Sequence, residues 1–226
     1  MKKEIFLFRH GRTLANEKKL YCGKSDLPLS PRGEAELLKK KGDGKKILPS
    51  ANFHSEPGFS YPDISHCTIF TSGLMRTIQT LKTLYPELSD LAIVEKGFQE
   101  INFGDFEMKS YDELKENPDY QKWLQEEVDR IPLRSTESSG NPCPNGESWG
   151  QMNERVLVSL EKILNNERSV AIFTHGGPIS AIMTHFFPDE RKSLYEWQPD
   201  FGEGYKITID EKSVFYEKIP QEGVRL

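Results

Sequence analysis

Two short apolar runs, each ending in a histidine followed by a glycine, constrain the fold of this chain most. Residues 5–8 lead into Arg9-His10-Gly11, and residues 170–173 lead into Thr174-His175-Gly176. Neither run alternates polar and apolar residues, which is typical of parallel strands covered on both faces. The two histidines can meet only if these strands lie near one another, and the carboxyl ends of such strands are where open α/β sheets bind ligands.

The order of the other elements predicts an α/β fold in a single domain spanning residues 1–226. Further strands are expected at about 67–70 and 92–95, with helices between the strands. This alternation predicts a three-layer sandwich with a central, mostly parallel sheet flanked by helices. The alternating runs 205–209 and 214–217 surround a polar turn and predict an antiparallel hairpin at one edge of the sheet.

Capping signals predict where helices begin. Ser30 precedes a proline and is expected to open a helix that runs to about residue 41. Ser72 is expected to cap the next helix, and Ser148 to start a capping box ahead of an apolar stripe. A helical stretch rich in tyrosine and tryptophan is expected from about 111 to 127.

Long polar stretches predict lids. Residues 42–62 contain three glycines and three prolines, and residues 134–146 are rich in Ser, Asn, Gly and Pro. Loops of this length in a compact domain are often functional. Lid or loop insertions are therefore expected at about 42–62 and 105–146.

Composition excludes several classes of partner. The net charge of −5 shows no basic excess of the kind that binds nucleic acid. The first apolar run is too short for a signal peptide or a membrane span, so we expect a cytoplasmic protein without a membrane partner. Cys22, Cys67 and Cys143 lack metal-ligand spacing and are expected as reduced thiols. The sequence predicts no oligomeric state.

The residues at the strand ends suit phosphate chemistry. Arg76 lies in the first turn of the helix after the strand at 67–70, and its side chain leans back toward the strand end. With Arg9, His10 and His175, it supplies two guanidiniums and two imidazoles. Arginines match the oxygens of a phosphoryl group, and a neutral imidazole can attack phosphorus. A general acid for the leaving group is then worth about 10²–10⁴ in rate.

Six motifs place these residues in a recognisable order between residues 5 and 179. They are Arg9-His10-Gly11-Arg12-Thr13, Gly23 with residues 26–30, residues 71–80, residues 99–107, residues 144–148 and residues 174–177. Their content and order resemble the histidine phosphatase superfamily, in the branch that includes cofactor-dependent phosphoglycerate mutases and related phosphatases.

The resemblance implies a role for each matching residue. His10 is expected as the nucleophile and Glu100 as the general acid. The residues expected to bind the phosphoryl group or its substrate are Arg9, Asn16, Gly23, Arg76, His175 and Gly176. The resemblance implies no metal ion and no cofactor.

The expected activity is metal-independent hydrolysis of a small phosphorylated metabolite through a phosphohistidine on His10. Residues 103–107 resemble the phosphatase members of the family rather than the mutases. A cofactor-dependent phosphoglycerate mutase is the alternative enzyme. A non-catalytic phosphate-binding module is the alternative from another class, although such modules typically lose the nucleophile or the acid. Sugar phosphates, phosphoglycerate, α-ribazole phosphate and broad specificity all stay open.

Three residue assignments have competing interpretations. Asp105 and Glu107 lie near Glu100 and are further candidates for the acid. Glu147 is either part of the pocket edge or a first-turn carboxylate favoured by the helix dipole. Cys22 stands where many relatives have glutamine, and we hypothesise that nearby arginines lower its pKa and make it sensitive to oxidation.

Overall fold

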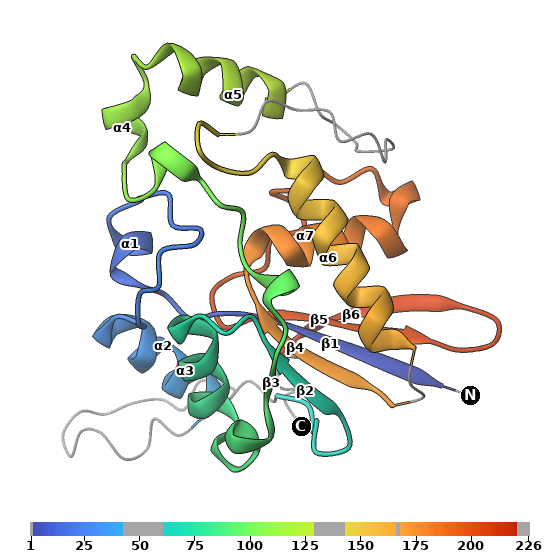
Figure 1. The fold of residues 1–226 in the computed structure, drawn as a ribbon. Coiled ribbons are helices and arrows are strands. Elements are labelled where there is room, and N and C mark those ends of the chain that lie inside the picture. Colours follow the sequence, from blue (N-terminus) through green and yellow to red (C-terminus); the bar gives the residue numbers. More distant parts are fainter. Residues whose placement is uncertain (1, 43–60, 129–142, 166–167, 221–226) are drawn as a thin grey trace.

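A computed structural model describes residues 2–42, 61–128, 143–165 and 168–220. Figure 1 shows a central sheet with helices on both of its faces. The strands are β1 (Lys3–Arg9), β2 (Thr68–Thr71), β3 (Ile93–Val94), β4 (Val170–Thr174), β5 (Gly204–Ile209) and β6 (Val214–Ile219). The α-helices are α1 (Leu14–Glu17), α2 (Pro31–Lys41), α3 (Met75–Leu84), α4 (Tyr111–Leu114), α5 (Pro118–Val128), α6 (Trp149–Leu164) and α7 (Gly176–Phe186). Short 3₁₀ turns are η2 (Pro86–Leu91), η3 (Lys96–Phe98), η4 (Gly104–Phe106) and η5 (Pro188–Glu190).

The sheet has six strands in the order β3-β2-β4-β1-β5-β6. Strands β1 to β4 pair in parallel, whereas β5 and β6 are antiparallel at one edge. The predicted fold, a mostly parallel sheet with an antiparallel edge hairpin, is confirmed. In the β1–β4 pair Arg9 lies opposite Thr174, and the backbone N–H of His10 donates to the carbonyl of Thr174 at 3.0 Å. This register places His10 and His175 at the ends of neighbouring strands.

Alternate side chains of the central strands enter two cores. Ile5 and Leu7 of β1 pack with residues of α6 and α7, whereas Phe6 and Phe8 pack with residues of α2 and α3. These helix pairs lie on opposite faces of the sheet in Figure 1. Each fully buried large apolar side chain contributes about 1.5–3 kcal/mol. The non-alternating apolar runs are therefore what holds the site-bearing strands in the middle of the molecule.

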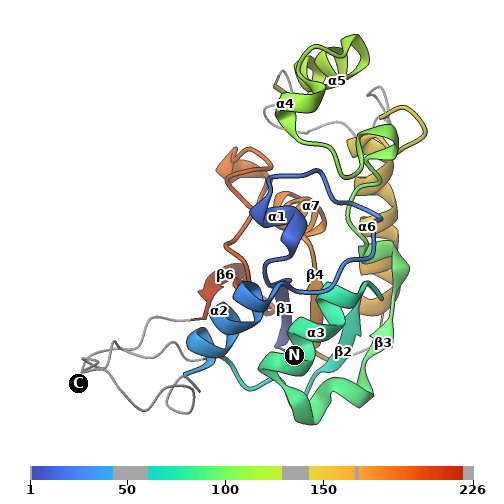
Figure 2. The ribbon, with the colours of Figure 1, turned by 90° about the vertical axis from the view of Figure 1, so that its left-hand side faces the viewer.

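A third apolar cluster packs α4 and α5 against η4. These two helices stand apart from the sheet in Figures 1 and 2. The cluster comprises Phe106, Leu114, Tyr120, Trp123 and Cys143. The hydroxyl groups of Tyr21 and Tyr120 are 2.6 Å apart, which links this cluster to the segment after α1. The single helical stretch expected at 111–127 is two helices, because Pro118 cannot continue the helix that precedes it.

Two of the three predicted caps are confirmed. The Ser30 hydroxyl accepts from the N–H of Gly33 and caps α2, and Ser148 forms the capping box that begins α6. The third is wrong, because α3 starts at Met75 and its N-cap residue, Leu74, makes no side-chain cap bond. Ser72 lies two residues before this N-cap, and its hydroxyl is 2.8 Å from Nε2 of His175.

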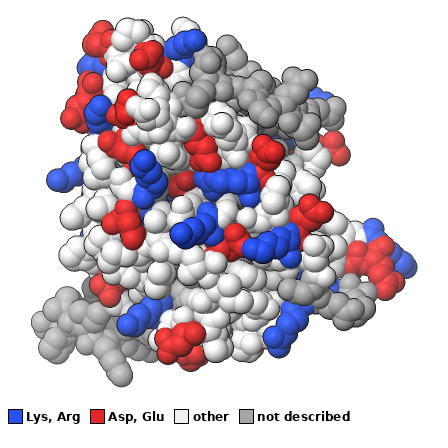
Figure 3. Space-filling model, viewed as in Figure 1, with Lys and Arg blue, Asp and Glu red and all other residues white. Residues whose placement is uncertain are grey.

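The lid predicted at 42–62 falls almost entirely on residues 43–60, which are outside the described residues. Of the one predicted at 105–146, residues 129–142 are outside the described residues, and the described part contains most of η4 and the whole of α4 and α5. Within the described ranges, no helix combines the length and apolar character needed to cross a bilayer. On the face shown in Figure 3, acidic and basic side chains are interspersed.

Candidate active site

The sheet brings His10 and His175 together. Their ring centroids are 5.0 Å apart, with an angle of 62° between the ring planes. His10 is 5% exposed and His175 is fully buried. The pair lies at the carboxyl ends of β1 and β4, where ligand sites in such sheets are found.

The proton on His10 is assigned by its hydrogen bond. Nδ1 lies 2.7 Å from the carbonyl oxygen of Gly11. A carbonyl only accepts, so Nδ1 carries the proton and Nε2 holds the lone pair. Burial lowers the pKa of His10 well below its usual value, and the charges of Arg76 and Arg9 act in the same direction. The ring is therefore neutral, and Nε2 is the atom equipped to attack an electrophile.

His175 has the opposite tautomer. Its Nδ1 accepts from Nε of Arg76 at 3.2 Å, so Nε2 carries the proton and donates to the Ser72 hydroxyl at 2.8 Å. Burial, followed by the charge of Arg76, lowers the pKa of His175 well below its usual value. The Ser72 hydroxyl lies 3.1 Å from that of Thr77, which extends the network into α3. His175 is thus a neutral N–H donor beside the nucleophilic candidate.

Arg76 is a fully buried cation held by neutral groups. Its Nη1 donates to the carbonyl of Ser25 at 2.7 Å and its Nη2 to the carbonyl of Gly23 at 2.6 Å. With the imidazole of His175, these acceptors fix the guanidinium without neutralising its charge. Such a cation attracts an anion with the geometry of a phosphate.

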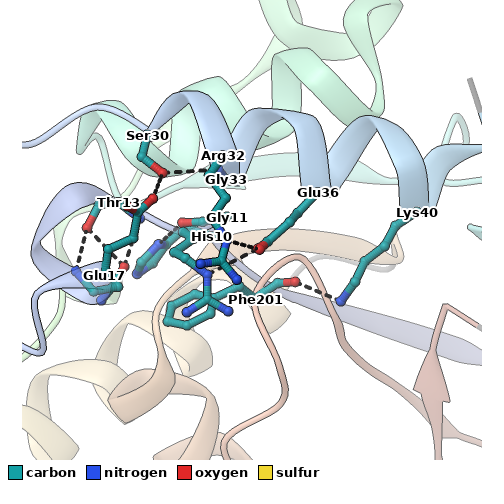
Figure 4. A network of polar contacts seen from close by, with 12 residues as sticks. His10, Gly11, Thr13, Glu17, Ser30, Arg32, Gly33, Glu36, Lys40 and Phe201 are labelled. Atoms are coloured by element: carbon teal, nitrogen blue, oxygen red, sulfur yellow. Dashed lines mark hydrogen bonds and ion pairs between the residues drawn. The ribbon is translucent and has the colours of Figure 1, made fainter. Parts of the chain in front are cut away.

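Arg9 lies against an aromatic ring. Its guanidinium carbon is 4.3 Å from the centroid of Phe201, that of Arg12 is 4.5 Å away, and the His10 ring centroid is 5.9 Å away. Figure 4 shows the Phe201 ring beside His10. Nη1 of Arg9 donates to the carbonyl of Pro199 at 2.7 Å. Nε of Arg9 is buried without a hydrogen-bond partner among the described residues, which leaves a donor for a bound anion.

The side chain of Glu100 contacts the first turn of α7. Its Oε2 accepts from the N–H of Gly177 at 3.2 Å, and its Oε1 from the N–H of Ile101 at 3.0 Å. Burial lowers the pKa of Arg9 and of Arg76, and the Glu100 carboxylate acts in the opposite direction on each. The carboxylate therefore shares the pocket with both guanidiniums. It also occupies one of the N–H groups in the first turn of α7, which is then not free to hold a bound anion.

Arg155 on α6 fixes the backbone that carries Glu100. Its Nη1 and Nη2 donate to the carbonyls of Gly97, Gln99 and Glu100 at 2.7–2.9 Å. Glu147 pairs with Arg155 through both carboxylate oxygens, at 2.6 and 2.8 Å. Glu147 therefore acts on the pocket through Arg155, and a helix-dipole role alone does not describe it.

Asn16 and the candidate glycines occupy defined positions around the pocket. The Asn16 side-chain oxygen accepts from the N–H of Thr13 at 3.0 Å, so the amide nitrogen is the group it can offer to an anion. A side chain at Gly23 is impossible, since its Cβ would lie 1.7 Å from the carbonyl oxygen of Ile101. Gly176 is the first residue of α7, directly after His175.

The hypothesis about Cys22 is wrong in direction. Its thiol is half-buried, and burial raises the pKa more than Arg76 lowers it. Its sulfur lies 3.6 Å from the carbonyl oxygen of Ser25. The arginines therefore do not make this thiol a thiolate.

Sequence reasoning missed the contacts that link four side chains to the pocket, those of Ser72, Glu107, Arg155 and Phe201. Ser72 and Glu107 were noticed, the first as a cap and the second as a competing acid. Arg155 and Phe201 matched none of the motifs considered. All four contacts join residues that are distant in sequence, so no local pattern signalled them.

Together these groups form a compact reactive pocket. It contains one imidazole with a free lone pair, one imidazole that donates, two guanidiniums and one carboxylate. This set can attract a dianion, attack it and move a proton to or from an oxygen atom.

Comparisons with known proteins agree with the fold and the motif order. The family model "Histidine phosphatase superfamily (branch 1)" matches residues 5–55 and 60–219. A 2,3-bisphosphoglycerate-dependent phosphoglycerate mutase of Bartonella tribocorum is 28% identical, over 81% of this chain and 81% of the relative. An adenosylcobalamin/alpha-ribazole phosphatase of Escherichia coli is 23% identical, over 92% and 91%. The solved structure of a phosphoglycerate mutase from Bacillus anthracis shares the fold, with a TM-score of 0.67 and 21% identity, over 98% of this chain and 94% of that one.

Proposed function

The chain belongs to branch 1 of the histidine phosphatase superfamily, and we propose that it hydrolyses a small phosphorylated metabolite through a phosphohistidine on His10. The observation that carries the proposal is the hydrogen bond from Nδ1 of His10 to the carbonyl of Gly11. It leaves Nε2 unprotonated in a buried pocket that also holds Arg76 and His175. An imidazole lone pair beside fixed cations suits attack on phosphorus.

In the first step, Arg9 and Arg76 bind the phosphoryl oxygens, while Nδ1 of His175 accepts from Arg76 and holds its guanidinium in place. Nε2 of His10 attacks phosphorus, and the bond from phosphorus to the leaving oxygen breaks. Protonated Glu100 gives its proton to that oxygen, so the product leaves as an alcohol. The cations stabilise the charge that builds up on the equatorial oxygens.

In the second step, water attacks the phosphohistidine. The Glu100 carboxylate takes a proton from the water as the new phosphorus–oxygen bond forms, and the bond from phosphorus to Nε2 breaks. Inorganic phosphate leaves, and His10 returns to its neutral form. The same carboxyl group thus serves as acid and then as base.

We propose that no metal ion is needed, because two guanidiniums supply the positive potential and the donors, and His10 supplies the nucleophile. The test is hydrolysis of p-nitrophenyl phosphate in the presence of EDTA. Wild type should turn over at an unchanged rate, and His10→Ala should lose about 10³-fold or more. His185→Ala is the control, because His185 is exposed near the end of α7. Equal rates for wild type and His10→Ala would remove the enzyme proposal.

The phosphoglycerate mutase activity of one relative makes a mutase the second candidate. A mutase must protect its phosphohistidine from water, whereas a phosphatase must admit water. Rapid quench with labelled phosphoglycerate separates the two. A long-lived phosphoenzyme that passes its label to phosphoglycerate would favour the mutase, and prompt release of labelled inorganic phosphate the phosphatase.

The substrate is proposed only as a phosphorylated metabolite. A screen at fixed enzyme concentration should include sugar phosphates, phosphoglycerate and α-ribazole phosphate. A kcat/KM at least tenfold above that for p-nitrophenyl phosphate would identify a preferred class. Similar values for all compounds would indicate broad specificity.

A further inference from the structure

The Glu107 carboxylate organises the loop that holds Arg76. It accepts from five donors, which are the N–H groups of Gly23, Lys24, Ser25 and Phe103 and the hydroxyl of Ser25, at distances of 2.6–3.4 Å. Three consecutive backbone N–H groups therefore converge on one carboxylate. Concave loops of this kind hold an anion tightly, and here the anion is part of the chain.

The other side of the same loop faces Arg76. The carbonyls of Gly23 and Ser25 accept from its two terminal nitrogens at 2.6 and 2.7 Å. The peptide unit between Gly23 and Lys24 takes part on both sides. Its N–H donates to Glu107 at 2.9 Å, and its carbonyl accepts from Arg76.

This arrangement links the carboxylate to the guanidinium through one aligned peptide dipole. Hydrogen bonds in such a chain polarise one another, which strengthens the contact between the carbonyl and the guanidinium. The negative charge of Glu107 thus steadies the buried cation through neutral carbonyl groups, which leave the positive charge of Arg76 available to an anion. A direct ion pair would instead neutralise that charge.

We propose that Glu107 is a positioning residue for the phosphate site, acting through loop 23–25 on Arg76. The inference rests on the proposed function, since it assumes that Arg76 binds the phosphoryl group. Gly23 is the residue that permits the arrangement, because a Cβ there would also lie 2.7 Å from Oε1 of Glu107. The sequence left both Glu100 and Glu107 as candidates for the general acid. Under this proposal Glu100 is the acid and Glu107 positions Arg76.

The competing explanation is that Glu107 only stabilises its own segment. Glu107 follows η4 and accepts from the N–H of Phe103, so its loss could loosen the chain around it. Glu100 lies on the same segment. A general loosening would therefore disturb the proposed acid as well and change the pH profile of kcat/KM, whereas a loss confined to Arg76 would not.

The test compares Glu107→Gln with Glu113→Gln. Glu113 is the matched control because it also accepts from a backbone N–H and a serine hydroxyl, both of Ser110, and lies in the same part of the chain. The affinity for inorganic phosphate is measured by isothermal titration, and the pH profile of kcat/KM with p-nitrophenyl phosphate. Glu107→Gln should weaken phosphate binding by about 10- to 100-fold and lower kcat/KM without moving the limbs of the profile. Glu113→Gln should stay within about twofold of wild type.

Ser25→Ala provides a second, milder variant. It removes the 2.6 Å contact with Glu107 but keeps the carboxylate, and should weaken phosphate binding by about 2- to 5-fold in a folded protein. If Glu107→Gln does not fold, this variant decides the question. Unchanged phosphate affinity in the folded variants, a loss matched by Glu113→Gln, or a shifted pH limb would overturn the inference. Failure of wild type to bind phosphate would instead overturn the proposed function.

Discussion

Gly177→Ala should disable the proposed proton donor, Glu100, while leaving the proposed phosphate site in place. A Cβ at this position would lie 2.3 Å from Oε1 of Glu100 and 2.9 Å from the sulfur of Met152. An ordinary carbon–oxygen contact is about 3.3 Å, so the carboxylate must move by about 1 Å. Both neighbouring atoms are at the ends of flexible side chains, so the protein should fold normally. A displacement of about 1 Å costs about 10²-fold in rate, or about 2.7 kcal/mol in the barrier.

The assay compares an alkyl phosphate with p-nitrophenyl phosphate. An alkoxide needs a proton to leave, whereas p-nitrophenolate is a weak base and leaves without one. Gly177→Ala should therefore lower kcat for the alkyl ester about 100-fold and for the aryl ester by much less. Glu100→Gln should show the same substrate pattern. Equal losses on both substrates, with circular dichroism unchanged, would refute the assignment of Glu100 as the acid.

Three further changes test other parts of the site. The pKa values of His10 and His175 lie below the value of about 6.5 that they have in the unfolded chain. Below pH 6.5 the unfolded chain therefore binds more protons than the folded one, and the free energy of unfolding should fall by up to about 2.7 kcal/mol for each unit of pH. Urea unfolding between pH 7 and 5 checks this, and a flat profile would contradict it. Arg155→Met should free the backbone of Glu100 and lower kcat about 10- to 100-fold. The affinity for phosphate, measured by isothermal titration, should stay unchanged, and weaker phosphate binding would show that Arg155 does more than hold Glu100. Phe201→Leu removes two cation–π contacts worth about 0.5–1 kcal/mol each, so KM for p-nitrophenyl phosphate should rise about 5- to 30-fold in steady-state kinetics. An unchanged KM would show that the ring does not position the guanidiniums.

The sequence predicted the central sheet well because its signal is local. The runs at 5–8 and 170–173 are apolar on both faces, and burial on both faces is what the sandwich gives β1 and β4. The caps at Ser30 and Ser148 were also predictable, since each bonds within its own first turn. The helix expected at 111–127 ignored the break that Pro118 imposes.

The support of the site could not be predicted in the same way. Ser72 has the residue type and position of a cap, but its hydroxyl meets His175 across 103 positions of sequence. Glu107 reaches Gly23 across 84 positions, and Phe201 lies in a loop with no periodic pattern. The motifs therefore indicated which residues gather in the pocket, whereas the contacts that orient them depend on tertiary packing.

The most direct test of the account is the chemical position of the phosphoryl group on the trapped enzyme. Wild type is mixed with labelled substrate, quenched in alkali within one turnover, and analysed by tandem mass spectrometry and phosphorus NMR. The hydrogen bond from Nδ1 to Gly11 predicts a single phosphohistidine at residue 10, with phosphorus on Nε2. Phosphorus on Nδ1, label on another residue, or single-turnover hydrolysis with no labelled enzyme would contradict it.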